Sequence, residues 1–310
     1  MKTGLRNLIQ RSGSLVLVLA LGSAASGCLY SPYSPVAGFS PEVNAALAEF
    51  FSRHQQTPGR RVAVFDGDGT VLGQAPHYLA DECMYEYAEA HPEHHPEVIR
   101  RISPQSNVSI PYVIGRVEFF SDLPLDEVRA LGVDCYDRLY ANRVFAPMRD
   151  LVAQLQKQGF EVWIVTASPE ALYQSFLSRE LGVPVTNVVG VKSIIHDGII
   201  SDRIVHPVPQ DEGKREAIET FVQARPLLVG GNSRGDREMI EFSADVRLIV
   251  NPDEHVATGQ EVSIADYART HDWLIARVED RAPADFPAIS SRRFGVRENR
   301  TQEVSGAETR

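Results

Sequence analysis

Two carboxylates follow a short apolar run in the first third of the chain. The run Val62–Phe65 leads into Asp66 and Asp68, and Gly67 and Gly69 flank the second of them. A short apolar run that ends at glycines is typical of a buried strand in the middle of a parallel sheet. The glycines allow a sharp turn and a close approach to a ligand. Because two neighbouring carboxylates repel each other unless a cation or a proton lies between them, the pair indicates a divalent metal, acid–base chemistry, or both.

Two simpler structures could contain the same acidic, glycine-rich stretch. Asp and Gly are common in surface turns, so a turn is one alternative. A calcium loop of the EF-hand kind is another, and it needs oxygen ligands at its fifth and twelfth positions and glycine at its sixth. Counted from Asp66, these positions hold Thr70, His77 and Val71. The calcium loop is therefore excluded, while the surface turn stays open on these residues alone.

Composition places the chain among globular proteins. It has 310 residues, of which 43% are hydrophobic and 23% are charged, and these fractions are ordinary for a folded domain. The length suits one large domain or two modest ones. The formal net charge of -10 argues against nucleic-acid binding, which needs a basic face. We therefore expect no nucleic-acid partner, and the oligomeric state stays open.

The first residues have the three-part layout of a secretory signal. Positive residues precede the apolar run Leu15–Leu21, and small residues lead up to Cys28. The run is too short to span a membrane. Ala25-Ser26-Gly27-Cys28 resembles the lipobox of bacterial lipoproteins, in which the cysteine is lipidated and becomes the mature N-terminus. We expect a signal peptide over residues 1–27 and a lipid anchor at Cys28; a plain cleaved signal ending near Ala25 is the alternative.

The anchor would place the protein in the cell envelope, facing the periplasm or the exterior. Residues 28–39 contain several prolines and serines and suit a linker from the membrane to the folded part. Disulfides persist in such a compartment. Cys83 and Cys135 could therefore pair, but the sequence does not give their distance, so two free thiols remain the alternative.

Apolar strands alternate with amphipathic helices along the rest of the chain. The expected strands are residues 62–65, 160–165, 226–230 and 246–250, with a hairpin over 188–205. This order predicts an α/β fold, a Rossmann-like, mostly parallel sheet flanked by helices, with right-handed crossovers.

Domain boundaries follow from the same pattern. The polar, helical stretch 73–142 interrupts the alternation directly after the first strand, so it is expected to be a helical cap. Residues 40–72 and 143–281 then form the α/β core. Residues 282–310 are polar and charged with few apolar anchors, so we expect a disordered tail.

Four motifs in this order resemble those of the haloacid dehalogenase superfamily. They are Asp66-Gly67-Asp68-Gly69-Thr70, then Thr166 at the end of a strand, then Lys214, then Gly231-Asn232-Ser233-Arg234-Gly235-Asp236. The helical insertion and the hairpin turn at Asp197-Gly198 are similar to the phosphoserine-phosphatase-like branch. The resemblance covers roughly residues 61–251.

The resemblance implies a hydrolase that acts on a small phosphorylated substrate. Asp66 would attack phosphorus and form an aspartyl-phosphate. Asp68 would protonate the leaving oxygen and then take a proton from the hydrolytic water. Thr166 and the amide of Ala167 would hold phosphate oxygens, and Lys214 would offset negative charge. True dehalogenases of this superfamily lack a carboxylate at the position of Asp68, so its presence favours phosphate esters.

The resemblance also implies Mg²⁺, held by Asp66, the carbonyl of Asp68, and Asn232 and Asp236 of the fourth motif. The family usually has Asp where this chain has Asn232. An amide oxygen can ligate magnesium without adding charge, so Asp236 would carry more of the electrostatics. The departure leaves open a second class of function, a low-turnover phosphate-ligand-binding or envelope-interaction lipoprotein on the same fold.

Substrate choice should depend on the cap, because in this architecture the cap closes over the leaving group. Asp81, Glu82 and Arg116 are candidate contacts for a polar substrate. The alternative for each is a solvated charge on a helix.

Overall fold

A seven-stranded sheet, in the order β4-β3-β2-β1-β5-β6-β7, carries the fold. Its neighbours are all parallel except for the β3–β4 hairpin. The strands are β1 (Val62–Phe65), β2 (Glu161–Pro169), β3 (Val188–His196), β4 (Ile199–Val205), β5 (Leu228–Gly231), β6 (Val246–Val250) and β7 (Leu274–Ala276). The predicted α/β fold with a mostly parallel sheet is confirmed.

The computed structural model describes residues 33–302. The predicted signal peptide, the lipidation site at Cys28, residues 28–32 of the predicted linker and residues 303–310 lie outside the described residues. The rest of the predicted linker, residues 33–39, is not a free tether, because Val36 and Phe39 are buried in the apolar core and the ring of Tyr33 stacks on Phe51. Within residues 33–302, no helix has both the length and the apolar character needed to cross a membrane.

Strand β1 lies at the centre of the sheet and is buried on both faces. Val62 and Val64 pack on one face, and Ala63 and Phe65 pack on the other, because successive side chains of a strand point to opposite sides. A strand that is covered twice needs apolar residues at every position. This is the physical reason for the unbroken apolar run before Asp66.

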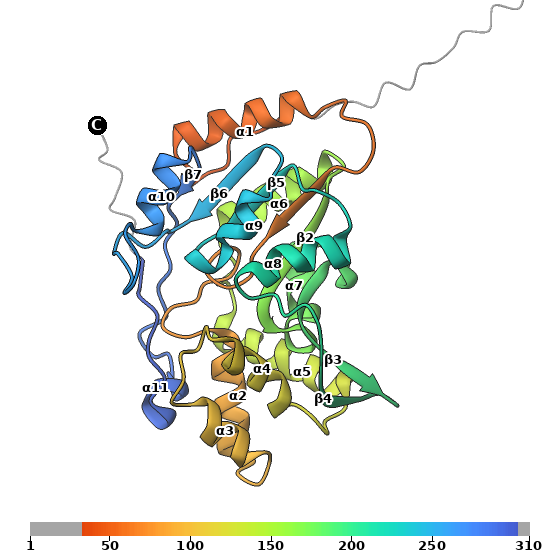
Figure 1. Cartoon of the computed structure of the whole chain (residues 1–310), viewed down its shortest axis with the longest axis vertical. Helices are drawn as coiled ribbons and strands as arrows, with labels where there is room; N and C mark the ends of the chain where they lie inside the picture. The colour runs from red at the N-terminus through yellow and green to blue at the C-terminus, as the bar shows by residue number, and fades with distance from the viewer. Residues whose placement is uncertain (1–32, 303–310) are drawn as a thin grey trace, which may run out of the picture. The chain divides into compact units, whose positions relative to one another are not determined.

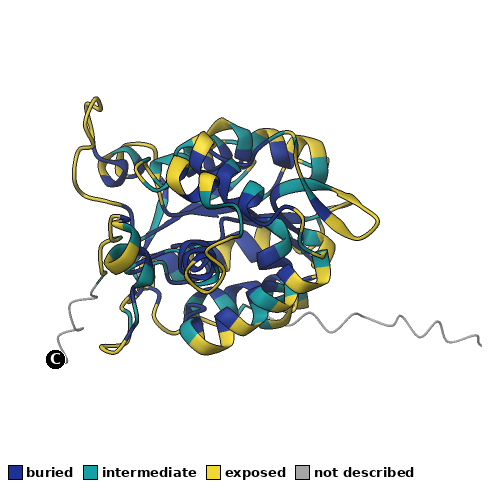
Figure 2. Cartoon of the chain, turned by 90° about the horizontal axis from the view of Figure 1, so that it is seen from below, coloured by how far each residue is buried: buried dark blue, intermediate teal, exposed yellow. Residues whose placement is uncertain are grey.

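Helices cover both faces of the sheet (Figure 1). One face packs against α1 (Pro41–Arg53), α6 (Ala146–Lys157) and α7 (Glu170–Leu181), and the other packs against α8 (Glu212–Ala217), α9 (Arg237–Glu241) and α10 (Ile264–Thr270). At the start of helix α1, Ser40 caps the helix by accepting a hydrogen bond from the Val43 amide, and Pro41 occupies the first turn. Figure 2 shows how burial concentrates in the sheet and on the inward sides of the helices.

The insertion after β1 is helical, as predicted. It contains α2 (Leu79–Ala90), α3 (Pro96–Ile102), α4 (Ile110–Phe119) and α5 (Leu125–Cys135), gathered beyond one edge of the sheet (Figure 1). The chain leaves and rejoins the core at one point, where Leu72 and Val144 form an antiparallel bridge. A disulfide between Cys83 and Cys135 joins α2 to the end of α5, so the structure settles the pairing that the sequence left open.

The predicted hairpin is also present. Asp197 and Gly198 form its turn with φ angles of 49° and 80°, the left-handed conformations that a tight hairpin turn needs. Near this turn, the Leu125 amide donates to the carbonyl of Gly198. The hairpin therefore supports the start of α5.

The expectation of a disordered tail is wrong for residues 282–302, which we call the C-terminal segment. Within it, α11 (Ile289–Phe294) packs on α2. Both oxygens of the buried Glu82 accept backbone hydrogen bonds, from Ile289 at 2.9 Å and Ser290 at 3.0 Å. The rings of Tyr85 and Phe294 stack with centroids 4.5 Å apart. Phe286, Ala288 and Val296 of the segment are buried in the main apolar core. The segment is therefore ordered by these apolar anchors together with the acceptor and the aromatic surface that α2 supplies.

Candidate active site

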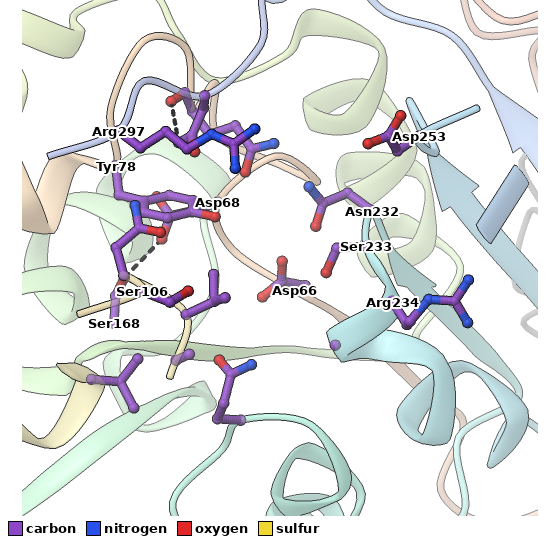
Figure 3. A pocket seen from close by; sticks show the side chains of 18 of the residues that line it. Asp66, Asp68, Tyr78, Ser106, Ser168, Asn232, Ser233, Arg234, Asp253 and Arg297 are labelled. Atoms are coloured by element: carbon purple, nitrogen blue, oxygen red, sulfur yellow. Dashed lines mark hydrogen bonds between the residues drawn. The ribbon is translucent and has the colours of Figure 1, made fainter. Parts of the chain in front are cut away.

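The predicted motif residues meet at the carboxyl ends of adjacent strands. Asp66 follows β1, Thr166 lies near the end of β2, and Asn232 follows β5, while Lys214 comes from α8. In open α/β sheets, ligands bind at this edge. These residues line a cavity of about 870 Å³, a size that suits a small-molecule ligand. Figure 3 shows Asp66 near the middle of the cavity.

A buried lysine bridges two buried carboxylates. The Lys214 ammonium lies 2.6 Å from Oδ1 of Asp66 and 2.5 Å from Oδ1 of Asp236. The other oxygen of Asp236 accepts from the amides of Asn232 and Ser233 and from the Ser233 hydroxyl. Asp236 therefore has donors on both oxygens, and it fixes Lys214 and the loop after β5 at once.

Charge and burial oppose each other in this group. Burial raises the pKa of Asp66 to about 7, the Asp236 carboxylate adds to the rise, and Lys214 counters it. Burial by itself lowers the pKa of Lys214, but the two carboxylates outweigh it and raise the pKa above its usual range. Lys214 is therefore a permanent cation, while Asp66 still lacks part of the positive charge that would keep it ionised.

Asp68 turns away from Lys214 toward a separate set of donors. Its Oδ2 accepts from the Ser168 hydroxyl and its Oδ1 from the Tyr173 hydroxyl, both at 2.8 Å. Burial raises the pKa of Asp68, and these two hydrogen bonds lower it. Ser168 lies near the end of β2, two residues after Thr166. Tyr173 comes from α7, and nothing in the sequence pattern marked it.

Thr166 lies directly against the loop that carries the two aspartates. A Cβ atom added to Gly67 would lie 3.0 Å from the Thr166 hydroxyl oxygen, which explains the glycine between the carboxylates. The same hydroxyl accepts a hydrogen bond from the Ser168 amide at 3.2 Å. Thr166 and Ala167 both line the cavity beside Asp66, as a phosphate-binding role requires.

Asn232 lies on the cavity wall, close to the Asp66 loop (Figure 3). A Cβ atom on Gly69 would come within 2.0 Å of the Asn232 side-chain nitrogen, and Gly69 has a φ of 79°. Only glycine lets the loop pass this side chain. Within residues 33–302, the Asn232 side chain has no hydrogen-bond partner, so its amide is free to face a ligand.

The donor set fits a hard divalent cation. The described residues contain no group of three or more His, Cys, Asp or Glu side chains suited to a metal. The available oxygens are instead the Asp66 carboxylate, the Asp68 main-chain carbonyl and the Asn232 amide, which are the kinds of ligand that Mg²⁺ accepts. Buried negative charge also exceeds buried positive charge here, since Asp66, Asp68 and Asp236 are all buried and Lys214 pairs with only two of them.

The insertion adds a second buried ion pair next to the cavity. The Nε atom of Arg116 donates to Asp81 at 2.7 Å, and the Tyr112 hydroxyl donates to the same oxygen at 3.0 Å. Neither Asp81 nor Arg116 is a solvated helix charge, because both are buried. Nη2 of Arg116 is buried without a partner, and Arg116 lines the cavity. Glu82, the third candidate, instead holds the C-terminal segment.

Comparison with known proteins agrees with this geometry. The family signature of haloacid dehalogenase-like hydrolases matches residues 63–241, more than half of the chain. The chain belongs to this family. The matched region runs from the first strand past Asp236, so it contains the residues of all four motifs.

Curated relatives match about half of the chain. A putative hydrolase of Mycobacterium leprae and the phosphoserine phosphatase SerB1 of Mycobacterium tuberculosis are each 26% identical to this chain over 157 residues, 51% of its length. The chain spans about half the length of these relatives.

Solved structures share the fold. A conserved protein of unknown function from Anaerococcus prevotii matches with a TM-score of 0.61 and 16% identity, covering 78% of this chain and 95% of that one. A protein of unknown function from Bordetella pertussis matches with a TM-score of 0.55 and 16% identity, covering 71% and 99%. At this identity the likeness concerns the fold alone.

The Asp236–Lys214 contact predicts a large stability effect. Asp236→Ala should lower the free energy of unfolding by about 3 kcal/mol, because it deprives a buried cation of a partner. Ser233→Ala removes one neutral donor to the same carboxylate and should cost about 1 kcal/mol. Urea denaturation of both variants measures the difference. Equal losses would show that Asp236 does not support the lysine.

Proposed function

We propose that the protein is a magnesium-dependent phosphomonoester hydrolase that works through an aspartyl-phosphate on Asp66. The observation that carries the proposal is the buried arrangement of two aspartates with separate partners. Asp66 contacts Lys214, whereas Asp68 contacts Ser168 and Tyr173. Carboxylates in such different surroundings can take different roles in one reaction.

In the first step, an oxygen of Asp66 forms a bond to phosphorus as the bond to the leaving oxygen breaks. The leaving oxygen takes a proton from Asp68, whose raised pKa favours the protonated form. Lys214 lies 2.6 Å from Asp66 and offsets the charge that gathers there. The hydroxyl of Thr166 and the amide of Ala167 line the cavity where phosphate oxygens would lie.

In the second step, a water molecule attacks phosphorus and the bond to Asp66 breaks. Asp68, now ionised, takes a proton from this water and returns to its starting state. The hydroxyls of Ser168 and Tyr173 hold the Asp68 carboxyl group in one orientation through both steps.

Asp66, the Asp68 carbonyl and Asn232 would hold Mg²⁺, which supplies positive charge to the transferring phosphate and to Asp66. Asp236 would hold Lys214 and the Asn232 loop in place beside these ligands, because its oxygens accept hydrogen bonds from Lys214 and from the loop amides.

The substrate class is a small phosphorylated molecule. One relative is named a phosphoserine phosphatase, and the cavity has room for a leaving group beside the phosphate. The free Nη2 of Arg116 is the buried donor best placed in the insertion to bind a polar group of the substrate.

Removal of the nucleophile tests the covalent mechanism. Asp66→Asn should abolish the magnesium-dependent hydrolysis of an aryl phosphate, because an amide cannot attack phosphorus. Asp197→Asn makes the same charge change in the distant hairpin turn and should retain wild-type activity. Full activity in Asp66→Asn would rule out the covalent route, and no activity in the wild type toward any phosphomonoester would favour a binding protein.

Asn232 tests the proposed metal ligands. Asn232→Asp should lower the magnesium concentration for half-maximal activity, because a carboxylate binds a hard cation more tightly than an amide does. The magnesium concentration that raises the melting temperature should fall in parallel, which reports binding without turnover. Asn232→Ala is the matched variant without an oxygen ligand and should shift both midpoints upward. Unchanged midpoints in both variants would show that residue 232 does not contact the metal.

We also propose that the protein is exported and anchored through Cys28. The support is the sequence alone, namely the signal-like start and the lipobox-like Ala25–Cys28. Cys28→Ser should move the protein from the membrane fraction to the soluble envelope fraction of a bacterial host. If the variant stays in the membrane fraction, the anchor lies elsewhere.

A further inference from the structure

The C-terminal segment forms part of the active-site wall, although it lies beyond the matched family region. Gly295, Arg297 and Asn299 line the same cavity as Asp66 and Lys214. The family signature ends at residue 241. A segment that is dispensable to the family core is thus positioned to contact the substrate.

Hydrogen bonds tie this segment to the residues that follow the catalytic loop. The Asn299 amide donates to the carbonyl of Pro76 at 2.6 Å, and its side chain donates to the carbonyl of Gln74 at 2.9 Å. Asp280, just before the segment, accepts from the amides of Gln74 and Ala75. The wall is therefore held against the short stretch that joins the nucleophile to α2.

Arg297 is the cationic side chain of this wall without a partner. Two other arginines of the segment are paired: Arg293 lies 3.1 Å from Glu89, and Arg300 lies 3.1 Å from Asp253. Arg297 is exposed, and within residues 33–302 it makes no ion pair or hydrogen bond. An unpaired guanidinium keeps its planar set of donors available for a carboxylate or a phosphate.

Its position identifies the part of the substrate that it would meet. Figure 3 shows Arg297 and Tyr78 on the Asp68 side of the cavity, with Arg234 and Asp253 on the opposite side of Asp66. The guanidinium carbon of Arg116 lies 5.3 Å from the centre of the Tyr78 ring, so the second free cationic donor is on this side as well. Because Asp68 would protonate the leaving oxygen, the leaving group must extend toward these two arginines.

We propose that Arg297 is a specificity-determining residue that binds an anionic group, a carboxylate or a second phosphate, on the leaving group. This inference rests on the proposed phosphomonoesterase function. It assigns the substrate class as phosphomonoesters whose leaving group is itself negatively charged.

The test compares Arg297→Gln with Arg300→Gln in the otherwise intact protein, since both remove one positive charge from the same segment. Each variant is assayed with two substrates whose leaving group carries an anionic group, phosphoserine and propane-1,3-diol bisphosphate, and with an aryl phosphate whose leaving group is uncharged. Arg297→Gln should lower kcat/KM about tenfold for one or both of the anionic substrates, mainly through KM, because a charge-assisted hydrogen bond is lost. Its kcat/KM for the aryl phosphate should change less than twofold, and Arg300→Gln should leave the preference unchanged.

The two anionic substrates distinguish the ligand. A loss confined to phosphoserine identifies a carboxylate site, and a loss confined to the bisphosphate identifies a second phosphate site. Equal effects on all three substrates, or no effect on any, would overturn the role of Arg297. If the wild type hydrolyses none of the three substrates, the proposed function fails. Calorimetric titration with phosphoserine and with the bisphosphate then tests the binding site alone. Weaker binding to Arg297→Gln than to Arg300→Gln supports the site, and equal binding to the two variants overturns it.

Discussion

The buried contact between Lys214 and two aspartates is the constraint on which the site depends. Charges are costly to bury unless they are paired and hydrogen-bonded. Lys214 joins the end of β1 to the loop after β5, because Asp66 belongs to the first and Asp236 to the second. Three segments far apart in sequence are thereby held at one edge of the sheet. The same contact leaves Asp66 short of positive charge, and a divalent cation is the kind of ligand that would supply it.

The sheet and the helical insertion contribute different residues to the cavity around this centre. Strands β1, β2 and β5 place the nucleophile, Thr166 and Asn232, and their rigid parallel packing fixes the spacing between them. Tyr173, from a core helix, orients Asp68. The insertion contributes Arg116 and its partner Asp81, and the disulfide between Cys83 and Cys135 ties two of its helices together. The motif residues thus come from the sheet and α8, whereas Arg116 of the cavity lining comes from the inserted helices.

The C-terminal segment, like the insertion, lies outside the sheet and contributes residues to the cavity wall. Phe286, Ala288 and Val296 anchor it in the main apolar core, and an acceptor and an aromatic ring on α2 complete its docking. Glu82 shows the principle well: as a helix charge in the sequence it was a candidate substrate contact, yet in the fold its oxygens bind the amides of Ile289 and Ser290. A buried carboxylate that caps a docked helix needs its partners in place, so the segment and α2 stabilise each other.

The sequence by itself determined the α/β fold, the insertion after β1 and the motif residues that the fold brings together in one cavity. These features are local: an unbroken apolar run marks a doubly covered strand, and Asp66-Gly67-Asp68-Gly69-Thr70 places two carboxylates on one tight turn. Only the tertiary structure decided which groups the carboxylates contact. Asp236 was expected to ligate a metal, but its donors are Lys214 and backbone amides, and Tyr173 carried no sequence signal at all. The tertiary structure also decided three further features: the pairing of the cysteines, the burial of Asp81 with Arg116 and the docking of residues 282–302. Each depends on distances between segments that are remote along the chain. Such distances are set by packing rather than by local sequence pattern.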